Sequence, residues 1–286
     1  MNPAQLNVYA TPHKWSQLVC RAFAKGTGAP IVPPFPLLPG EVFSYGCLRG
    51  LLPTLLQAER EGRTWYLCDN GYFRPGKTEQ SYFRITRNAL QHTGTGEWPF
   101  PRHVARERWR RLGIPIAPWR ARGRHVLVCP PLRLAGATWG YDADEWLRQT
   151  VKTLGKYSDR EIRVRAKLSW QDNKTSNTSG YEGRDKPTHS SMLVTLAEDL
   201  RNCHAVVVRT SNCAVEALLA GVPVFCTHEC AAEPMGLRDL KQIESPVYPD
   251  NREWWATLLA SNQWTLGEMR NGTAWRMLCE SAAARS

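Results

Sequence analysis

The alternation of apolar runs with helical segments in the second half of the chain limits the possible folds more than any other feature. Four runs of strand length are separated by segments whose apolar residues recur at helical spacing. The expected strands are 126–129, 161–165, 205–208 and 223–226, and the expected helices are 142–157, 192–202 and 213–220. Strands that alternate with helices pair in parallel through right-handed crossovers, which predicts a doubly wound α/β domain.

The first half repeats this order around a proline-rich loop at residues 29–40. The expected strands are 6–10, 42–45 and 64–68, and the expected helices are 14–25 and 51–61. Residues 101–125 are rich in arginine and contain Pro115 and Pro118, which indicates the join between two domains. The fold class is therefore α/β, with two Rossmann-like parallel-sheet domains and a cleft between them. The predicted domains are 1–120 and 121–286, with the C-terminal helices in the second.

The composition favours an acidic partner. The 286 residues have a net charge of +11, from 37 Lys and Arg against 26 Asp and Glu, which suits nucleic acid, nucleotide or membrane phosphate. No apolar run approaches the ~20 residues that cross a bilayer, and the N-terminal residues lack the order of a secretory signal. We therefore expect no membrane span, a cytoplasmic location and a monomer.

Nine cysteines lie mostly in apolar segments, where cysteine behaves as a small buried hydrophobic residue. Their odd number argues against a disulfide framework in a reducing compartment. Cys226, His228 and Cys230 have a spacing that a metal site could use, but no second Cys/His pair lies near them in the sequence. No metal site is predicted.

A polar segment follows the expected strand at 205–208 and begins the next helix. It contains Arg209, Thr210, Ser211 and Asn212, and ligands of open α/β sheets bind beyond the carboxyl ends of the strands. Ser211 is expected to be the helix N-cap, where free backbone N–H groups suit a phosphate. The carboxylate of Glu216, about one turn further on, could accept hydrogen bonds from two vicinal hydroxyls such as those of a ribose. The alternative is a capped core helix with an incidental glutamate.

A second cationic segment lies at residues 163–169. Arg163, Arg165 and Lys167 fall on one side of the expected strand, because side chains alternate along a strand. Arg165 and Lys167, at its carboxyl end, are predicted to bind a diphosphate. An exposed edge strand is the alternative.

Two residues of the first half are candidates for the catalytic base. Asp69 follows the expected strand at 64–68, and a carboxylate at a strand end can deprotonate an acceptor hydroxyl. His13 follows the first strand and is the alternative base, because imidazole titrates near neutral pH. Either residue could instead be a turn-former.

Aromatic and cationic residues alternate between residues 72 and 124. Aromatic side chains such as Tyr72 and Phe83 could stack on bases while arginines contact phosphates. The alternative is an aromatic core with solvated arginines. The predicted nucleic-acid contacts are Arg74, Arg84, Arg87, Arg108, Arg110, Arg111, Arg120 and Arg122.

The pattern S-x-x-x-x-E-A-L-x-x-G-x-P-V, which begins at Ser211, resembles the donor-site segment of GT-B-fold glycosyltransferases. It is similar in particular to that of capsule-type sugar transferases and phage enzymes that glycosylate DNA bases. The resemblance implies that Ser211 and Asn212 face the donor phosphates and Glu216 faces the ribose. It also implies a nucleotide-sugar co-substrate with no other cofactor. Sugar epimerases share this donor-site segment. The segment DNGYF at 69–73 resembles segments of phage-encoded proteins related to these transferases.

These observations predict a metal-independent glycosyltransferase that moves a hexose or pentose from a nucleotide-sugar to a hydroxyl. The basic first half favours DNA as the acceptor substrate, with the hydroxyl on a hydroxymethylated pyrimidine extruded from the duplex, in the host cytoplasm if the protein is phage-encoded. A cell-surface or capsular saccharide is the alternative acceptor. A non-catalytic DNA-binding protein of the same fold is the third hypothesis.

Overall fold

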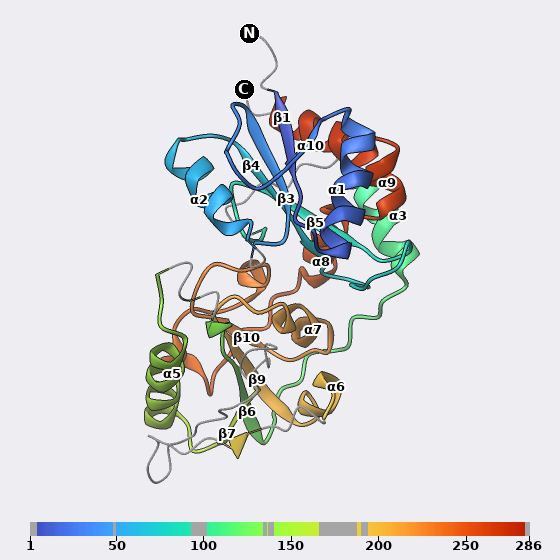
Figure 1. Cartoon of the computed structure of the whole chain (residues 1–286). Helices are drawn as coiled ribbons and strands as arrows, with labels where there is room; N and C mark the ends of the chain where they lie inside the picture. The colour runs from blue at the N-terminus through green and yellow to red at the C-terminus, as the bar shows by residue number, and fades with distance from the viewer. Residues whose placement is uncertain are drawn as a thin grey trace. The chain divides into compact units, whose positions relative to one another are not determined.

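The computed structural model describes residues 5–47, 50–92, 102–133, 136, 140–165, 188–189 and 194–283. The chain folds into two compact units (Figure 1). The first consists of Met1–Ile114 together with Ala256–Ser286, and the second is Pro115–Trp255. The join therefore lies within the arginine-rich stretch at 101–125, a few residues before the predicted boundary.

The first unit is built on a six-stranded sheet in the order β11-β5-β4-β3-β1-β2. Strands β1 to β4 pair in parallel, whereas β5 pairs antiparallel with both β4 and β11. The strands are β1 (Leu6–Tyr9), β2 (Ile31–Val32), β3 (Glu41–Tyr45), β4 (Trp65–Asn70), β5 (Phe83–Arg87) and β11 (Gln263–Trp264). The sheet is thus parallel at its centre, as predicted, with two antiparallel strands that the sequence analysis missed. It also missed β2, which pairs with β1 from within the segment 29–40 that was expected to be loop.

Helices cover this sheet through amphipathic faces. They are α1 (Lys14–Thr27), α2 (Leu52–Arg60), α3 (Arg102–Leu112), α9 (Leu266–Arg270) and α10 (Thr273–Ala283), while α8 (Arg252–Ser261) spans the boundary between the units. In the core Phe23 of α1 stacks on Phe43 of β3, with the ring centroids 3.7 Å apart, and meets Trp275 edge-on. None of the helices in the described ranges is both long and apolar enough to cross a bilayer.

The C-terminal segment belongs to the first unit, which corrects its assignment to the domain at 121–286. Strand β11 extends the first sheet, and Trp264, Leu266 and Met269 are fully buried in the same core as α1. Helices α1 and α9 approach so closely that a Cβ on Gly26 would lie 1.9 Å from the Met269 carbonyl oxygen. Only glycine permits this contact, and the tail is therefore an integral part of the unit.

The second unit contains an all-parallel, five-stranded sheet in the order β10-β9-β6-β7-β8. Its strands are β6 (His125–Cys129), β7 (Glu161–Val164), β8 (Thr188–His189), β9 (Cys203–Val208) and β10 (Val224–Cys226). The helices are α5 (Ala143–Tyr157), α6 (Leu196–Asp199) and α7 (Cys213–Leu219), with 3-10 turns at Glu233–Met235 and Leu240–Gln242. The residues of β9 are buried throughout, as expected for a central strand covered on both faces. The predicted α/β class is confirmed.

Candidate functional site

The strands of the second sheet are parallel, so the loops that follow β7, β9 and β10 all emerge at the carboxyl ends of the strands, which we call the carboxyl edge of the sheet. The sequence analysis predicted a ligand site at this carboxyl edge. Arg165 directly follows β7, Arg209 follows β9, and Thr227 with His228 follows β10. The indole Nε1 of Trp146, on α5, donates to Thr227 Oγ1 at 2.8 Å and ties that helix to the loop after β10.

Arg209 is held by two residues that the sequence analysis did not predict. Its guanidinium lies over the ring of Tyr141, 3.7 Å from the centroid, and its Nη2 is 3.1 Å from His228 Nε2. Partial burial lowers the pKa of Arg209. Within the described part of the chain no carboxylate pairs with Arg209. A cation that is partly withdrawn from water and lacks a counter-charge favours the binding of an anion.

Polar acceptors lie just beyond Arg209. Asn212 Oδ1 is buried and has no hydrogen-bond partner within the described residues. Such an atom costs free energy unless a ligand or a water supplies a donor. Thr210 and Ser211 complete the turn and are half-buried. The turn therefore combines a site for negative charge with an unfilled position for a donor.

The capping of α7 differs from the prediction. The N-cap is Asn212, not Ser211, and its side chain makes no capping hydrogen bond. Ser211 Oγ instead accepts from the backbone N–H of Cys213 at 3.4 Å, a long contact. The helix therefore begins one residue later than a serine cap would place it.

Glu216 occupies the predicted position one turn into α7. Solvent reaches the side chain, but the surrounding protein partly desolvates the carboxylate and raises its pKa, and the guanidinium of Arg165 opposes this shift. A carboxylate in such surroundings gains more from donors such as hydroxyls than one in open water.

Arg165, which was predicted as a donor ligand, has a structural partner within the protein. It forms an ion pair of 2.5 Å with Asp199, whose side chain is only 4% exposed, and it donates to the Val194 carbonyl at 3.0 Å. A buried carboxylate needs its counter-charge, and this explains the cation at the end of β7. Lys167, the other predicted diphosphate ligand, lies outside the described residues.

Replacement of Arg165 by alanine is expected to destabilise the protein by about 3–5 kcal/mol, because it leaves the Asp199 carboxylate buried and unpaired. The double variant R165A/D199A should recover part of this loss, since it removes the orphaned charge. Urea unfolding midpoints of the three proteins measure the effect. Equal stability of R165A and the parent chain would contradict a structural role for the pair.

In the first unit, Asp69 lies within β4, and its Oδ2 accepts from Arg84 Nη2 at 2.8 Å. The two residues face each other in the antiparallel register of β4 and β5. The Asp69 side chain remains 40% exposed, so it is both oriented and accessible. His13 is the N-cap residue of α1, after β1. Both candidate bases therefore lie at the carboxyl edge of the first sheet, with β3 between their strands.

Three of the eight arginines in the predicted nucleic-acid band make internal contacts. Arg84 also donates to the Asn70 carbonyl, and buried Arg108 binds Glu268 and the Gln263 carbonyl. Arg120 donates to the Leu200 and Cys203 carbonyl oxygens. These three arginines hold the tail or neighbouring loops in place, which corrects their assignment as phosphate contacts.

The aromatic part of the band is also internal. Tyr72, Phe73 and Phe83 are buried, and Phe73 packs on Trp109 with ring centroids 5.2 Å apart. Their rings are therefore unavailable to stack on bases, and the alternative of an aromatic core is the better description.

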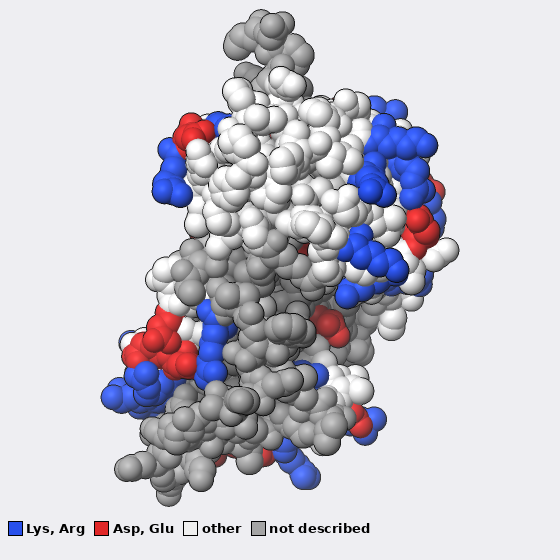
Figure 2. Space-filling view, viewed as in Figure 1, with Lys and Arg blue, Asp and Glu red and all other residues white. Residues whose placement is uncertain are grey.

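Several of the predicted cations do remain at the surface. Arg74 is exposed, although it donates to the Leu112 carbonyl, Arg87 is half-buried, and Arg110, Arg111 and Arg122 are exposed. Figure 2 shows Lys and Arg gathered along the side of the first unit that carries α1, α9 and α3. On this face the basic residues of the first unit are thus gathered over helices.

The sequence contains an Asp-x-Asp pattern, Asp142-Ala143-Asp144, which the prediction of metal-independent transfer overlooked. Asp142 Oδ1 caps α5 by accepting from the backbone N–H groups of Asp144 and Glu145, and Asp144 pairs with Arg133 at 2.9 Å. In the described ranges no three His, Cys, Asp or Glu side chains converge as metal ligands.

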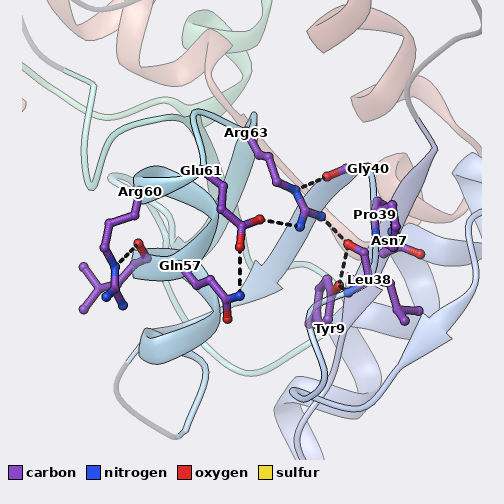
Figure 3. A network of polar contacts seen from close by, with 10 residues as sticks. Asn7, Tyr9, Leu38, Pro39, Gly40, Gln57, Arg60, Glu61 and Arg63 are labelled. Atoms are coloured by element: carbon purple, nitrogen blue, oxygen red, sulfur yellow. Dashed lines mark hydrogen bonds and ion pairs between the residues drawn. The ribbon is translucent and has the colours of Figure 1, made fainter.

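A recess of about 500 Å³ lies at the opposite edge of the first sheet, where β3 and β4 begin. Leu37, Glu41, Glu61 and Arg63 are among its lining residues. Figure 3 shows the Arg63 guanidinium contacting the carbonyl oxygens of Gly40 and Leu38 and the Glu61 carboxylate. This network fastens the proline-rich loop to the sheet, away from the edge that bears Asp69 and His13.

Two solved structures with similar folds are transferases. The KpsC β-Kdo 2,4-transferase of Thermosulfurimonas dismutans has a TM-score of 0.53 at 13% identity, covering 92% of this chain and 91% of that chain. The chain has a GT-B-like fold. The KpsC β-Kdo 2,7-transferase of the same organism has a TM-score of 0.51 at 12% identity, covering 95% and 99%. No family model and no curated protein sequence matches the chain. The GT-B-like assignment confirms, at the level of fold, the resemblance to capsule-type sugar transferases.

Proposed function

We propose that the protein is a glycosyltransferase whose nucleotide-sugar donor binds at the carboxyl edge of the second sheet. The observation that carries this proposal is the unmet polar demand of residues 209–216. Among the residues that the structure describes, no carboxylate pairs with Arg209 and no donor reaches Asn212 Oδ1. A nucleotide-sugar offers negatively charged phosphate and hydroxyl donors in one molecule, and it would meet both demands.

The remaining residues of the turn have roles that follow from their positions. Glu216 would accept from the ribose hydroxyls, while Thr210 and Ser211 would contact the phosphates beside Arg209. Lys167 is proposed as a further phosphate ligand. Arg165 would not touch the donor. It would neutralise the buried Asp199 carboxylate, and its positive charge would favour the ionised form of Glu216.

The proposed chemistry separates charge at the donor and removes a proton at the acceptor. As the bond between sugar and phosphate breaks, negative charge builds on the leaving phosphate, where Arg209 would stabilise it. Asp69, or alternatively His13, would take the proton of the attacking hydroxyl. Arg84 would orient Asp69 for this step. A mechanism without metal remains our proposal.

We propose a saccharide hydroxyl as the acceptor. The two similar structures are named as Kdo transferases, and three arginines and three aromatic rings of the predicted DNA band are used internally. A hydroxymethylated pyrimidine in DNA is the competing acceptor, and the surface cations of the first unit favour testing it.

A thermal-shift screen of nucleotides and nucleotide-sugars tests the donor site. A ligand that binds only the native state raises the free energy of unfolding, by about 2.7 kcal/mol when its concentration is 100 times its Kd. The melting temperature rises as a result. At least one compound is expected to raise the melting temperature, and Glu216→Gln should reduce that shift. A screen with no shift, or a shift unchanged in Glu216→Gln, would contradict the proposed site.

Transfer of labelled sugar separates the acceptors. With the donor found in the screen, label should enter an oligosaccharide and not hydroxymethylated or plain DNA. Label in hydroxymethylated DNA alone would support the base as acceptor. Duplex binding without any transfer would favour a non-catalytic DNA-binding protein.

A further inference from the structure

Two buried thiols lie in direct contact in the second unit. The Sγ atoms of Cys226 and Cys230 are 3.2 Å apart, and the two residues are 1% and 0% exposed. A disulfide requires about 2.05 Å between sulfurs. Closure therefore needs a movement of roughly 1 Å between side chains only four positions apart in the sequence. This feature is independent of the proposed transferase activity.

The surroundings make the two thiols unequal. A hydrogen bond joins them, in which Cys230 Sγ donates to Cys226 Sγ. The thiolate is the form of cysteine that reacts with oxidants. Whichever sulfur reacts first, the other thiol lies in contact with it and can displace the product.

Packing limits where Cys226 can turn. A Cβ on Gly236 would lie 3.0 Å from Cys226 Sγ, so the sulfur is closely packed on that side. Cys226 ends β10, whose pairing with β9 fixes its backbone. The sulfur of Cys226 is thus held facing Cys230, and little conformational freedom has to be lost when the bond forms.

We propose that Cys226 and Cys230 form a site of reversible oxidation that closes an intramolecular disulfide, with a hydroperoxide as the oxidant. One thiolate of the pair attacks the peroxide, the O–O bond breaks, and the departing hydroxide takes a proton to become water. The other thiol then attacks the resulting sulfenic acid, the S–O bond breaks, and a second water leaves with the proton of that thiol. Two thiols and one hydrogen peroxide thus give one disulfide and two waters.

Peptide mapping of the full chain after hydrogen peroxide treatment tests this site, because Glu229 lies between the two cysteines. After alkylation of free thiols, a protease that cleaves after Glu releases 217–229, with Cys226, and 230–244, with Cys230, because the Glu233–Pro234 bond resists cleavage. These peptides are expected to stay joined without reductant and to separate when a dithiol is added. Dithiol treatment before mapping should restore alkylation at both cysteines.

Two variants define the bond. Cys230→Ala should abolish the joined pair, while Cys213→Ala, which removes a half-buried thiol of the same unit, should leave it intact. Alkylated Cys226 and Cys230 after peroxide, a bond from either one to Cys213, or irreversible sulfinic acid at either one would each overturn the proposal. The parent chain alone decides the result if a variant fails to fold.

Discussion

Deletion of residues 256–286 is expected to unfold the first unit while the second remains folded. The tail supplies strand β11 and the fully buried side chains Trp264, Leu266 and Met269. Truncation of buried Trp costs about 3–5 kcal/mol, and truncation of buried Leu or Met costs about 2–5 kcal/mol each. Their sum reaches the total stability of a domain, about 5–15 kcal/mol.

Limited proteolysis with mass spectrometry measures this outcome. In the truncated chain, peptides from 5–114 should be digested rapidly, and a resistant fragment close to 115–255 should persist. The matched control is Arg276→Ala, at an exposed position of α10, which should digest like the parent chain. Equal resistance of both units after truncation would contradict an integral role for the tail.

Replacement of Arg209 by alanine is expected to weaken nucleotide binding about 10- to 100-fold without unfolding the chain. A hydrogen bond to a charged group contributes about 1.5–3 kcal/mol, and Arg209 is the cation of the turn without a carboxylate partner in the described ranges. Isothermal titration with the ligand found by the thermal-shift screen gives the affinity. His228→Ala and Tyr141→Phe should have smaller effects, because these residues only position the guanidinium.

The control for this prediction is Arg122→Ala, which removes an exposed arginine of the same unit. It should bind nucleotide like the parent chain, so that loss of net charge alone is excluded as the cause. If Arg209→Ala and Arg122→Ala reduce affinity equally, the effect is long-range electrostatics and the local site is wrong.

The sequence predicted the longer parallel strands because their signal is local, and it missed the two-residue strands β2 and β8. Apolar runs such as 205–208 are continuous, and turn residues interrupt them. Strand β5 was missed because Phe83–Arg87 contains two arginines, and it was interpreted as a surface for nucleic acid. The structure shows that Arg84 is neutralised by Asp69 across an antiparallel register, which no local pattern reports.

The candidate site was predicted only in part for the same reason. Arg209 and Glu216 lie in one continuous segment, so their proximity follows from the chain itself. Tyr141 and His228 approach Arg209 from two other loops, and their contacts depend on the strand order of the sheet. Arg165 looked free in the sequence because its partner, Asp199, is 34 residues away.

The interrupted course of the chain through the first unit has a consequence for its biosynthesis. A ribosome must translate all of 115–255 before it makes the strand that completes the earlier sheet. The inserted unit can therefore fold first, while apolar side chains of the N-terminal segment remain exposed to solvent. We expect nascent chains stalled before residue 256 to recruit chaperones through that N-terminal segment.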